Sequence, residues 1–208
     1  MLTPLRRSGQ IINLNKTEIN MKIQKYLGGI VMAYALLSAN LVFGQMEKTK
    51  MVGGAEMYPS KNIVQNAVNS ADHTTLVAAV KAAGLVETLQ GDGPFTVFAP
   101  ENSAFEKLPD GTVETLLKHE NKGQLTAVLT YHVVAGKMGS KEIAEAIKTG
   151  NGKATLKTVQ GGQLTAWMKG KDLYITDENG GKSKVVIADV WQKNGVIHSV
   201  DTVVLPKM

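Results

Sequence analysis

The segment from Gly93 to Phe105 constrains the fold of this 208-residue chain more than any other. Its first half places large apolar side chains on both faces of an extended backbone. Along it, one face receives Phe95, Val97 and Ala99, and the other receives Thr96 and Phe98. Only a strand covered on both sides can bury both sets, so the pattern predicts an interior strand.

The second half of this segment predicts a sharp change of structure. Pro100 ends the strand, because proline has no amide proton to donate to a ladder. Asn102 is a good helix N-cap, and a short helix carrying Ala104 and Phe105 is expected before Pro109. This strand, corner and helix contain no nucleophile or general base, so they predict architecture rather than activity.

The first 44 residues have the pattern of an export leader. Lys22 and Lys25 form a basic start, and residues 26–42 are mostly apolar and uncharged. We interpret residues 21–44 as a signal peptide and residues 1–20 as sequence upstream of the true start, with a genuine extension as the alternative. A membrane anchor is the rival interpretation, because the apolar run approaches the roughly 17–25 residues that span a bilayer.

Composition beyond the leader restricts the partners. The chain has no cysteine, so a secreted form must be held together by its core. Without the leader's five basic residues and one acidic residue, 18 basic and 17 acidic residues remain, a net charge of +1. All 18 cations are lysines, so the planar guanidinium that reads phosphate and guanine edges is missing. Nucleic acid is therefore not an expected partner.

Residues 45–59 are polar and glycine-bearing and are predicted to be a linker, and residues 60–206 have the length of one domain. The first part of that domain has apolar residues at helical spacing. Helices are expected to begin at Ser60, Asp72, Asp110, Asn121 and Ser140, and the second of these to end at Gly84.

From Lys153 onward the apolar period falls to two. Strands are predicted at 154–159, 164–168, 172–176, 185–190, 196–201 and 203–206. Glycine turns between them favour a curled or two-part sheet with the helices on one flank. A helical half followed by a strand half predicts the α+β class.

Three segments together resemble the fasciclin (FAS1) domain family. Residues 95–105 resemble its first box, residues 125–134 with Tyr131 and His132 its tyrosine-histidine motif, and residues 194–206 its second box. The resemblance covers residues 58–206. It implies two small β-sheets forming a wedge beside a cluster of α-helices, a secreted or cell-surface location, and adhesion without a characteristic catalytic reaction.

Two departures from the animal members limit what the resemblance implies. The chain carries one copy of the domain, so avidity from tandem repeats within one chain is not expected. It has no arginine beyond the leader, so an Arg-Gly-Asp tripeptide is impossible there. The sequence is more similar to short bacterial members, and animal-type receptor binding is not carried over.

The resemblance draws attention to a possible adhesion surface formed by the loop after Pro100 and the tyrosine-histidine motif. Its candidate residues are Glu101, Asn102, Tyr131 and His132. The alternative for Tyr131 and His132 is structural, with the tyrosine ring packed against the sheet and the histidine bonded to a backbone carbonyl or a carboxylate. We favour the structural interpretation, because a lone buried histidine is usually a core residue whose ring nitrogens are hydrogen-bonded.

Catalytic and metal sites find little support in the sequence. His198 and Asp201 are three residues apart on a predicted strand and should point to opposite faces, which is poor geometry for a base and its orienting acid. The histidines, at 73, 119, 132 and 198, are scattered and show no metal-ligand spacing. We predict no enzyme activity, no cofactor and no metal.

Four residues of the strand half could contact an apolar ligand, since some fasciclin-like proteins hold carotenoids. These are Trp167, Met168, Tyr174 and Trp191. Filling of the core is the alternative, because aromatic residues on alternating strands ordinarily face inward.

The predicted function is a secreted, non-catalytic module for cell-surface, matrix or biofilm adhesion through contacts with a protein or polysaccharide. The alternative is an extracytoplasmic carrier of an apolar small molecule such as a carotenoid. The protein is expected in the periplasm, on the cell surface or in the medium, as a monomer or weak oligomer that meets the membrane only during export. Both predictions require Val97 and Ile197 to lie side by side inside one globule.

Overall fold

The computed structural model describes residues 48–207. The predicted signal peptide at 21–44, the residues before it and the start of the predicted linker lie outside the described residues. Within 48–207, no helix has the length and apolar character needed to cross a bilayer.

The described chain begins with a β-hairpin where the sequence predicted a linker. Strands β1 (Lys50–Val52) and β2 (Ala55–Met57) pair in antiparallel fashion. Val52 and Met57 are 4% and 3% exposed and belong to the main core. The prediction of a linker was wrong for these residues, because two apolar side chains in a polar segment are enough to anchor a short hairpin. At its turn Gly53 has φ +56°, and a Cβ there would lie 2.6 Å from the amide nitrogen of Asp72.

Seven α-helices and two short 3₁₀ helices are described. The α-helices are α2 (Ile63–Ala67), α3 (Thr74–Ala83), α4 (Val86–Gln90), α5 (Asn102–Phe105), α6 (Thr112–Leu116), α7 (Lys122–Tyr131) and α8 (Ser140–Thr149), and the 3₁₀ turns are η2 (Ala71–His73) and η3 (His119–Asn121). Gly84 ends α3 in the left-handed conformation, as predicted. Helix α2 starts later than predicted, because Asn62 rather than Ser60 is its N-cap, in a capping box with Gln65.

The strands after the hairpin form one seven-stranded sheet in the order β4-β3-β9-β8-β7-β6-β5. Their bounds are β3 (Phe95–Pro100), β4 (Val133–Ala135), β5 (Lys153–Lys157), β6 (Gln163–Lys169), β7 (Asp172–Thr176), β8 (Lys182–Gln192) and β9 (Gly195–Val200). Residues 203–206, predicted as a strand, have no strand structure. The long strand β8 shifts register on both sides of Ile187 and belongs to both parts of the sheet. A bridge between Val134 and Thr158 brings the two ends together, so the sheet is nearly closed.

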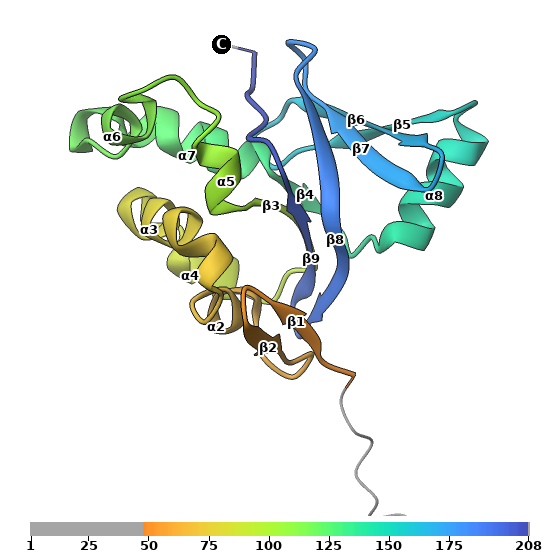
Figure 1. Ribbon diagram of the computed structural model, residues 1–208, viewed down its shortest axis with the longest axis horizontal. Helices are drawn as coiled ribbons and strands as arrows, with labels where there is room; N and C mark the ends of the chain where they lie inside the picture. Colours follow the sequence, from red (N-terminus) through yellow and green to blue (C-terminus); the bar gives the residue numbers. More distant parts are fainter. Residues whose placement is uncertain (1–47, 208) are drawn as a thin grey trace, which may run out of the picture. The chain divides into compact units, whose positions relative to one another are not determined.

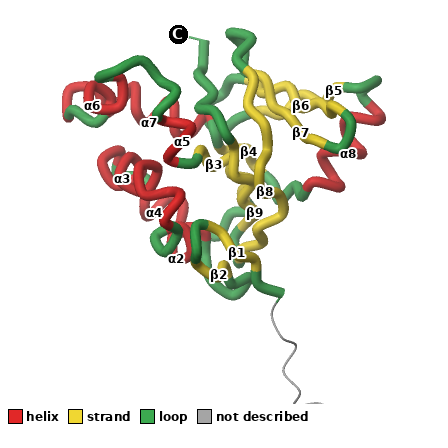
Figure 2. Tube along the Cα trace, in the orientation of Figure 1, coloured by secondary structure: helices red, strands yellow, loops and turns green. Residues whose placement is uncertain are grey.

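The central pair β3–β9 is parallel and places Val97 opposite Ile197, which confirms the predicted contact. Val97 and Ile197 are buried in the core shared with α2, α3, α4 and α7, whereas Phe98 is buried in a second core on the other face. Figure 1 shows α2 to α7 on one side of this pair, and Figure 2 separates the helical and strand layers by colour. The predicted interior strand is confirmed.

Helix α8 is the exception to the predicted single flank of helices. It lies beside β5, β6 and β7, away from the other helices (Figure 1). Ile143 and Ile147, one helical turn apart, are buried with Leu164 and Ala166 in the second core. The prediction was wrong for α8 because the apolar inner face of β5, β6 and β7 is buried by packing against this helix. The predicted α+β class, with a wedge-like sheet beside helices, is confirmed.

Candidate functional site

The predicted site residue Tyr131 lies at the end of α7 and is fully buried. Its hydroxyl donates to the carbonyl of Gln163 at 2.6 Å and accepts from the amide of Glu178 at 3.2 Å. Burial raises the pKa of Tyr131 to about 12. The phenol therefore acts as a fixed cross-link between the end of α7, the start of β6 and the turn after β7.

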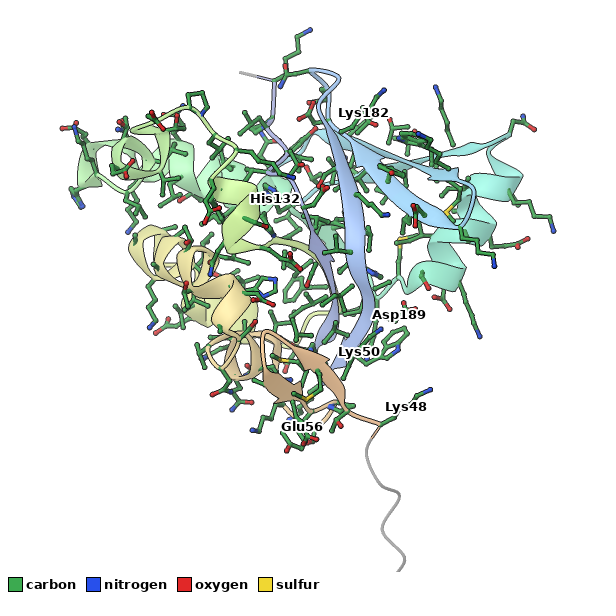
Figure 3. The ribbon with its side chains drawn as sticks, viewed as in Figure 1. Lys48, Lys50, Glu56, His132, Lys182 and Asp189 are labelled. Atoms are coloured by element: carbon green, nitrogen blue, oxygen red, sulfur yellow. The ribbon has the colours of Figure 1, made fainter. Side chains whose placement is uncertain are left out.

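His132 follows directly and is 3% exposed (Figure 3). Its Nδ1 donates to the carbonyl of Val128 at 2.8 Å, and its Nε2 accepts from the amide of Val204 at 3.2 Å. Burial lowers the pKa of His132 to about 4, so the ring is neutral near pH 7. This second hydrogen bond joins the tyrosine-histidine motif to the second box, residues 194–206, which contains Val204.

This burial corrects the predicted adhesion surface. Neither Tyr131 nor His132 presents its side chain to solvent, so the structural interpretation of both residues is the one that the geometry supports. The remaining candidates, Glu101 and Asn102, are partly exposed.

Asn102 has a structural role that differs from the predicted one. It is the first residue of α5 rather than its N-cap. Its Oδ1 accepts from the amide of Thr75 at 3.0 Å, and its Nδ2 donates to the carbonyl of Ala71 at 2.8 Å. Because α3 has no side-chain cap from its own N-cap residue, Asn102 caps α3 from a distance of almost thirty residues.

Glu101 lies near two other acids at the same corner. Burial, followed by the charges of Asp72 and Asp201, raises the pKa of its carboxyl group. Lys107 contacts Asp201 at 3.6 Å. This corner is the part of the predicted adhesion surface that stays accessible.

The two other buried histidines are also held inside the fold. His73 contacts the hydroxyls of Ser70 at 2.8 Å and Ser199 at 3.2 Å. His198 contacts the carbonyl of Met138 at 2.9 Å and accepts from the amide of Asp189 at 3.3 Å. Burial lowers the pKa of both rings. Among residues 48–207, no three metal-ligating side chains gather into a possible metal site.

The pairing of His198 with Asp201, disfavoured from the sequence, does not form. Asp201 accepts instead from the amide of Lys184 at 2.8 Å and from the hydroxyl of Thr202 at 3.0 Å. Both residues therefore have structural roles, through different partners.

Asp189 makes a contact that no sequence pattern predicted. It has φ 58°, and its carboxylate accepts from the amide of Ser140 at 2.6 Å and from the hydroxyl of the same residue. Ser140, predicted to cap α8, is instead its first residue. Burial opposes ionisation of Asp189, but the bonds from Ser140 together with the nearby His198 and Lys50 outweigh it and lower the pKa. Asp189 belongs to β8, and Lys50 of β1 lies near its carboxylate (Figure 3).

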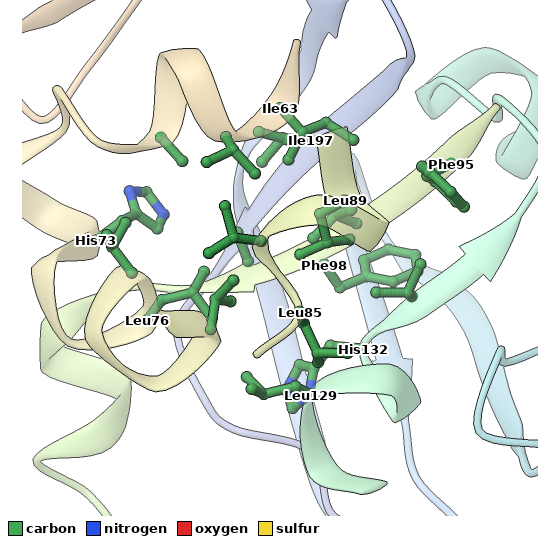
Figure 4. A pocket seen from close by; sticks show the side chains of 18 of the residues that line it. Ile63, His73, Leu76, Leu85, Leu89, Phe95, Phe98, Leu129, His132 and Ile197 are labelled. Carbon is green, nitrogen blue, oxygen red and sulfur yellow. The ribbon is translucent and has the colours of Figure 1, made fainter. Parts of the chain in front are cut away.

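An apolar cavity of about 110 Å³ lies between the helices and the β3–β9 pair. Its walls come from α2, α3, α4 and α7 and from the strands, and His73 and His132 border it (Figure 4). Lining side chains include Ile63, Leu76, Leu85, Leu89, Phe95 and Ile197. Such a cavity offers apolar contact and few polar groups.

The four predicted contacts for an apolar ligand do not line this cavity. Trp167 and Tyr174 are partly exposed, and Met168 and Trp191 are 37% and 39% exposed. Filling of the core was also a wrong expectation for them. Leu164 and Ala166 take the inward positions of β6, so alternation sends Trp167 outward.

Comparisons with known proteins agree with this architecture. The fasciclin domain model matches residues 71–206. The chain is 44% identical to Protein sll1483 of Synechocystis over 162 residues, covering 78% of this chain and 83% of that protein. It is 35% identical to Immunogenic protein MPB70 of Mycobacterium bovis over 145 residues, covering 67% and 66%.

Among solved structures, a FAS1 domain pair from the insect cell adhesion molecule Fasciclin I superposes with a TM-score of 0.64. The identity is 17%, and the match covers 71% of this chain and 52% of that one. The fold is thus of the FAS1 class, a nearly closed sheet with helices packed on it. With the family model matched over most of the described residues, the chain belongs to the fasciclin domain family.

Proposed function

We propose that this protein is a secreted, non-catalytic binding module that mediates adhesion to a cell surface or matrix. The observation that carries the proposal is that the buried tyrosine and histidine side chains, which could serve in catalysis or ligand binding, are bonded to other parts of the protein. Tyr131, His73, His132 and His198 are each bonded to other parts of the fold. Groups held in this way stabilise the domain, so recognition falls to the outer surface.

Two further facts support this proposal. The family includes Fasciclin I, an insect cell adhesion molecule, whose FAS1 pair has the same fold. The leader pattern of residues 21–44 is consistent with export to the periplasm, the cell surface or the medium.

The proposal is tested by coating a surface with the purified secreted protein and counting attached cells of the producing organism. Attachment well above that on a surface coated with the heat-unfolded protein is expected. Equal attachment to both coatings would remove the adhesive function, because adhesion through a folded surface must be lost on unfolding.

The cavity favours a second candidate function, a carrier of a small apolar molecule. Its volume of about 110 Å³ is close to that of an engineered apolar cavity of ~150 Å³ that binds benzene. It is well below the ~300–1,000 Å³ typical of sites for drug-sized ligands. A single-ring or short-chain ligand fits this description, whereas a carotenoid would need the helices to move apart.

The carrier function is tested by thermal unfolding with added benzene or short alkanes. A rise in Tm is expected for the unaltered protein and for Val68→Phe, which changes an exposed residue of the α2 end outside the cavity. The rise should be absent in Val80→Phe, since Val80 lines the cavity. An equal rise in both variants would exclude this cavity as the site.

A further inference from the structure

The outer face of strands β5 to β8 is a candidate interaction surface that the sequence motifs do not include. On these strands every second residue is buried beneath the sheet, as with Leu156, Ile175 and Val185. The alternate residues face outward. They include five lysines, Lys153, Lys157, Lys169, Lys182 and Lys184, which we call the basic face.

The strand register sets these residues in rows. Lys153 lies opposite Trp167, Trp167 opposite Tyr174, and Tyr174 opposite Lys184. The neighbouring row contains Thr155, Thr165, Thr176 and Lys182. An aromatic pair flanked by lysines therefore runs beside a row of hydroxyl groups across four strands.

The aromatic pair is fixed in place. The ring centroids of Trp167 and Tyr174 are 4.8 Å apart with 18° between the ring planes. Trp167 Nε1 donates to the hydroxyl of Thr176 at 2.9 Å, and Lys182 Nζ lies 5.9 Å from the centroid of the Trp167 ring. Figure 3 labels Lys182 at the start of β8, next to β6 and β7. Rings held in this way lose little entropy when a partner binds.

The charge of this face is strongly one-sided. Strands β5 to β8 contain two acids, and one of them, Asp189, bonds to Ser140 at the start of α8. The other, Asp172, contacts Lys184 at 2.7 Å, which leaves four of the five lysines without an acidic partner on the face. Beyond the leader the whole chain carries a net charge of only +1. The basic face is thus a local excess of positive charge, and it complements an extended anionic partner.

We propose that the basic face binds an anionic polysaccharide, a polymer of sugars bearing carboxylate or sulfate groups. Lysines pair with the anionic groups, the Trp167–Tyr174 pair contacts the apolar faces of sugar rings, and the threonine row bonds to sugar hydroxyls. Lysine offers a compact, hydrated charge rather than the arginine fork suited to phosphate, which disfavours nucleic acid. The inference rests on the proposed adhesive function and assigns its partner class.

The test measures binding of the purified protein to immobilised alginate, with dextran as the uncharged control polymer. Binding to alginate is expected to weaken as NaCl is raised, because salt screens exposed charges. The variant Lys153→Gln/Lys157→Gln/Lys182→Gln should bind about tenfold more weakly. A matched variant, Lys118→Gln/Lys122→Gln/Lys141→Gln, removes three exposed lysines outside the basic face and should bind within about twofold of the unaltered protein.

Tm values of both variants verify that they are folded. Equal weakening in the two triple variants would overturn the assignment to this face. Equally tight binding of single-stranded DNA or polyglutamate would overturn the polysaccharide class. If cells attach but alginate does not bind, the polysaccharide inference is wrong and the adhesive function is unaffected. If alginate binds but cells do not attach, the adhesive function is wrong and polysaccharide binding is retained.

Discussion

The amide of Val204 donates a hydrogen bond to Nε2 of His132, 3.2 Å away and 72 residues earlier in the chain. The other ring nitrogen donates to the carbonyl of Val128. One neutral imidazole thus joins the end of α7 to the closing segment. A protonated ring would have two donors facing one donor and one acceptor, so this arrangement requires the neutral form.

Stability should therefore fall in mild acid. The pKa of His132 is about 4 in the folded protein and near 6.5 when unfolded, so the unfolded state binds more protons between these pH values. The stabilisation is complete above pH ~6.5 and is lost as the pH falls toward 4, by about 3 kcal/mol. Urea unfolding measured from pH 7.5 to 4 should show this slope, and a flat profile would contradict it.

Replacing the ring tests its role directly. His132→Phe leaves the Val204 amide without its acceptor inside the fold and should lower the free energy of unfolding by about 2–3 kcal/mol. His119→Phe is the matched control, because His119 is exposed, and should change stability by less than about 0.5 kcal/mol. Chemical unfolding at pH 7.5 measures both. Similar values for the two variants would show that the His132 contacts are not stabilising.

Asn102→Ala should destabilise the protein through a helix to which Asn102 does not belong. Loss of its acceptor leaves the amide of Thr75 at the start of α3 unpaired, at a cost of about 1–2 kcal/mol. The adjacent exposed Ser103→Ala should be nearly neutral. Hydrogen exchange gives a local readout, in which the α3 amides should lose protection in Asn102→Ala. Unchanged exchange in α3 would argue against capping by Asn102.

The contact between Asp189 and Ser140 should appear as an energetic coupling. Asp189→Asn and Ser140→Ala each remove part of the cap of α8 and should each cost about 1 kcal/mol. The double variant should be less destabilised than the sum, by at least about 0.5 kcal/mol, since both changes remove the same bond. Strict additivity in thermal or urea unfolding would mean that the two side chains act separately.

Much of the architecture followed from local pattern. The two-faced run from Phe95 to Ala99 predicted a covered interior strand, and period-two alternation located β5, β6 and β7. The site was harder to predict. Tyr131 and His132 were recognised as a motif, but whether they face inward depends on where α7 ends relative to β6 and the C-terminal segment.

The sequence by itself determined the α+β class, because apolar residues recur along it first at helical spacing and then at every second position. Its resemblance to the FAS1 boxes gave the family and the expectation that Val97 lies beside Ile197. Only the tertiary structure decided which side chains complete the helix ends and which face of a strand meets solvent. Asn102 and Asp189 cap helices distant in the sequence, and Trp167 lies outward beside Tyr174. Such contacts join residues that are close only after folding, so no local spacing encodes them.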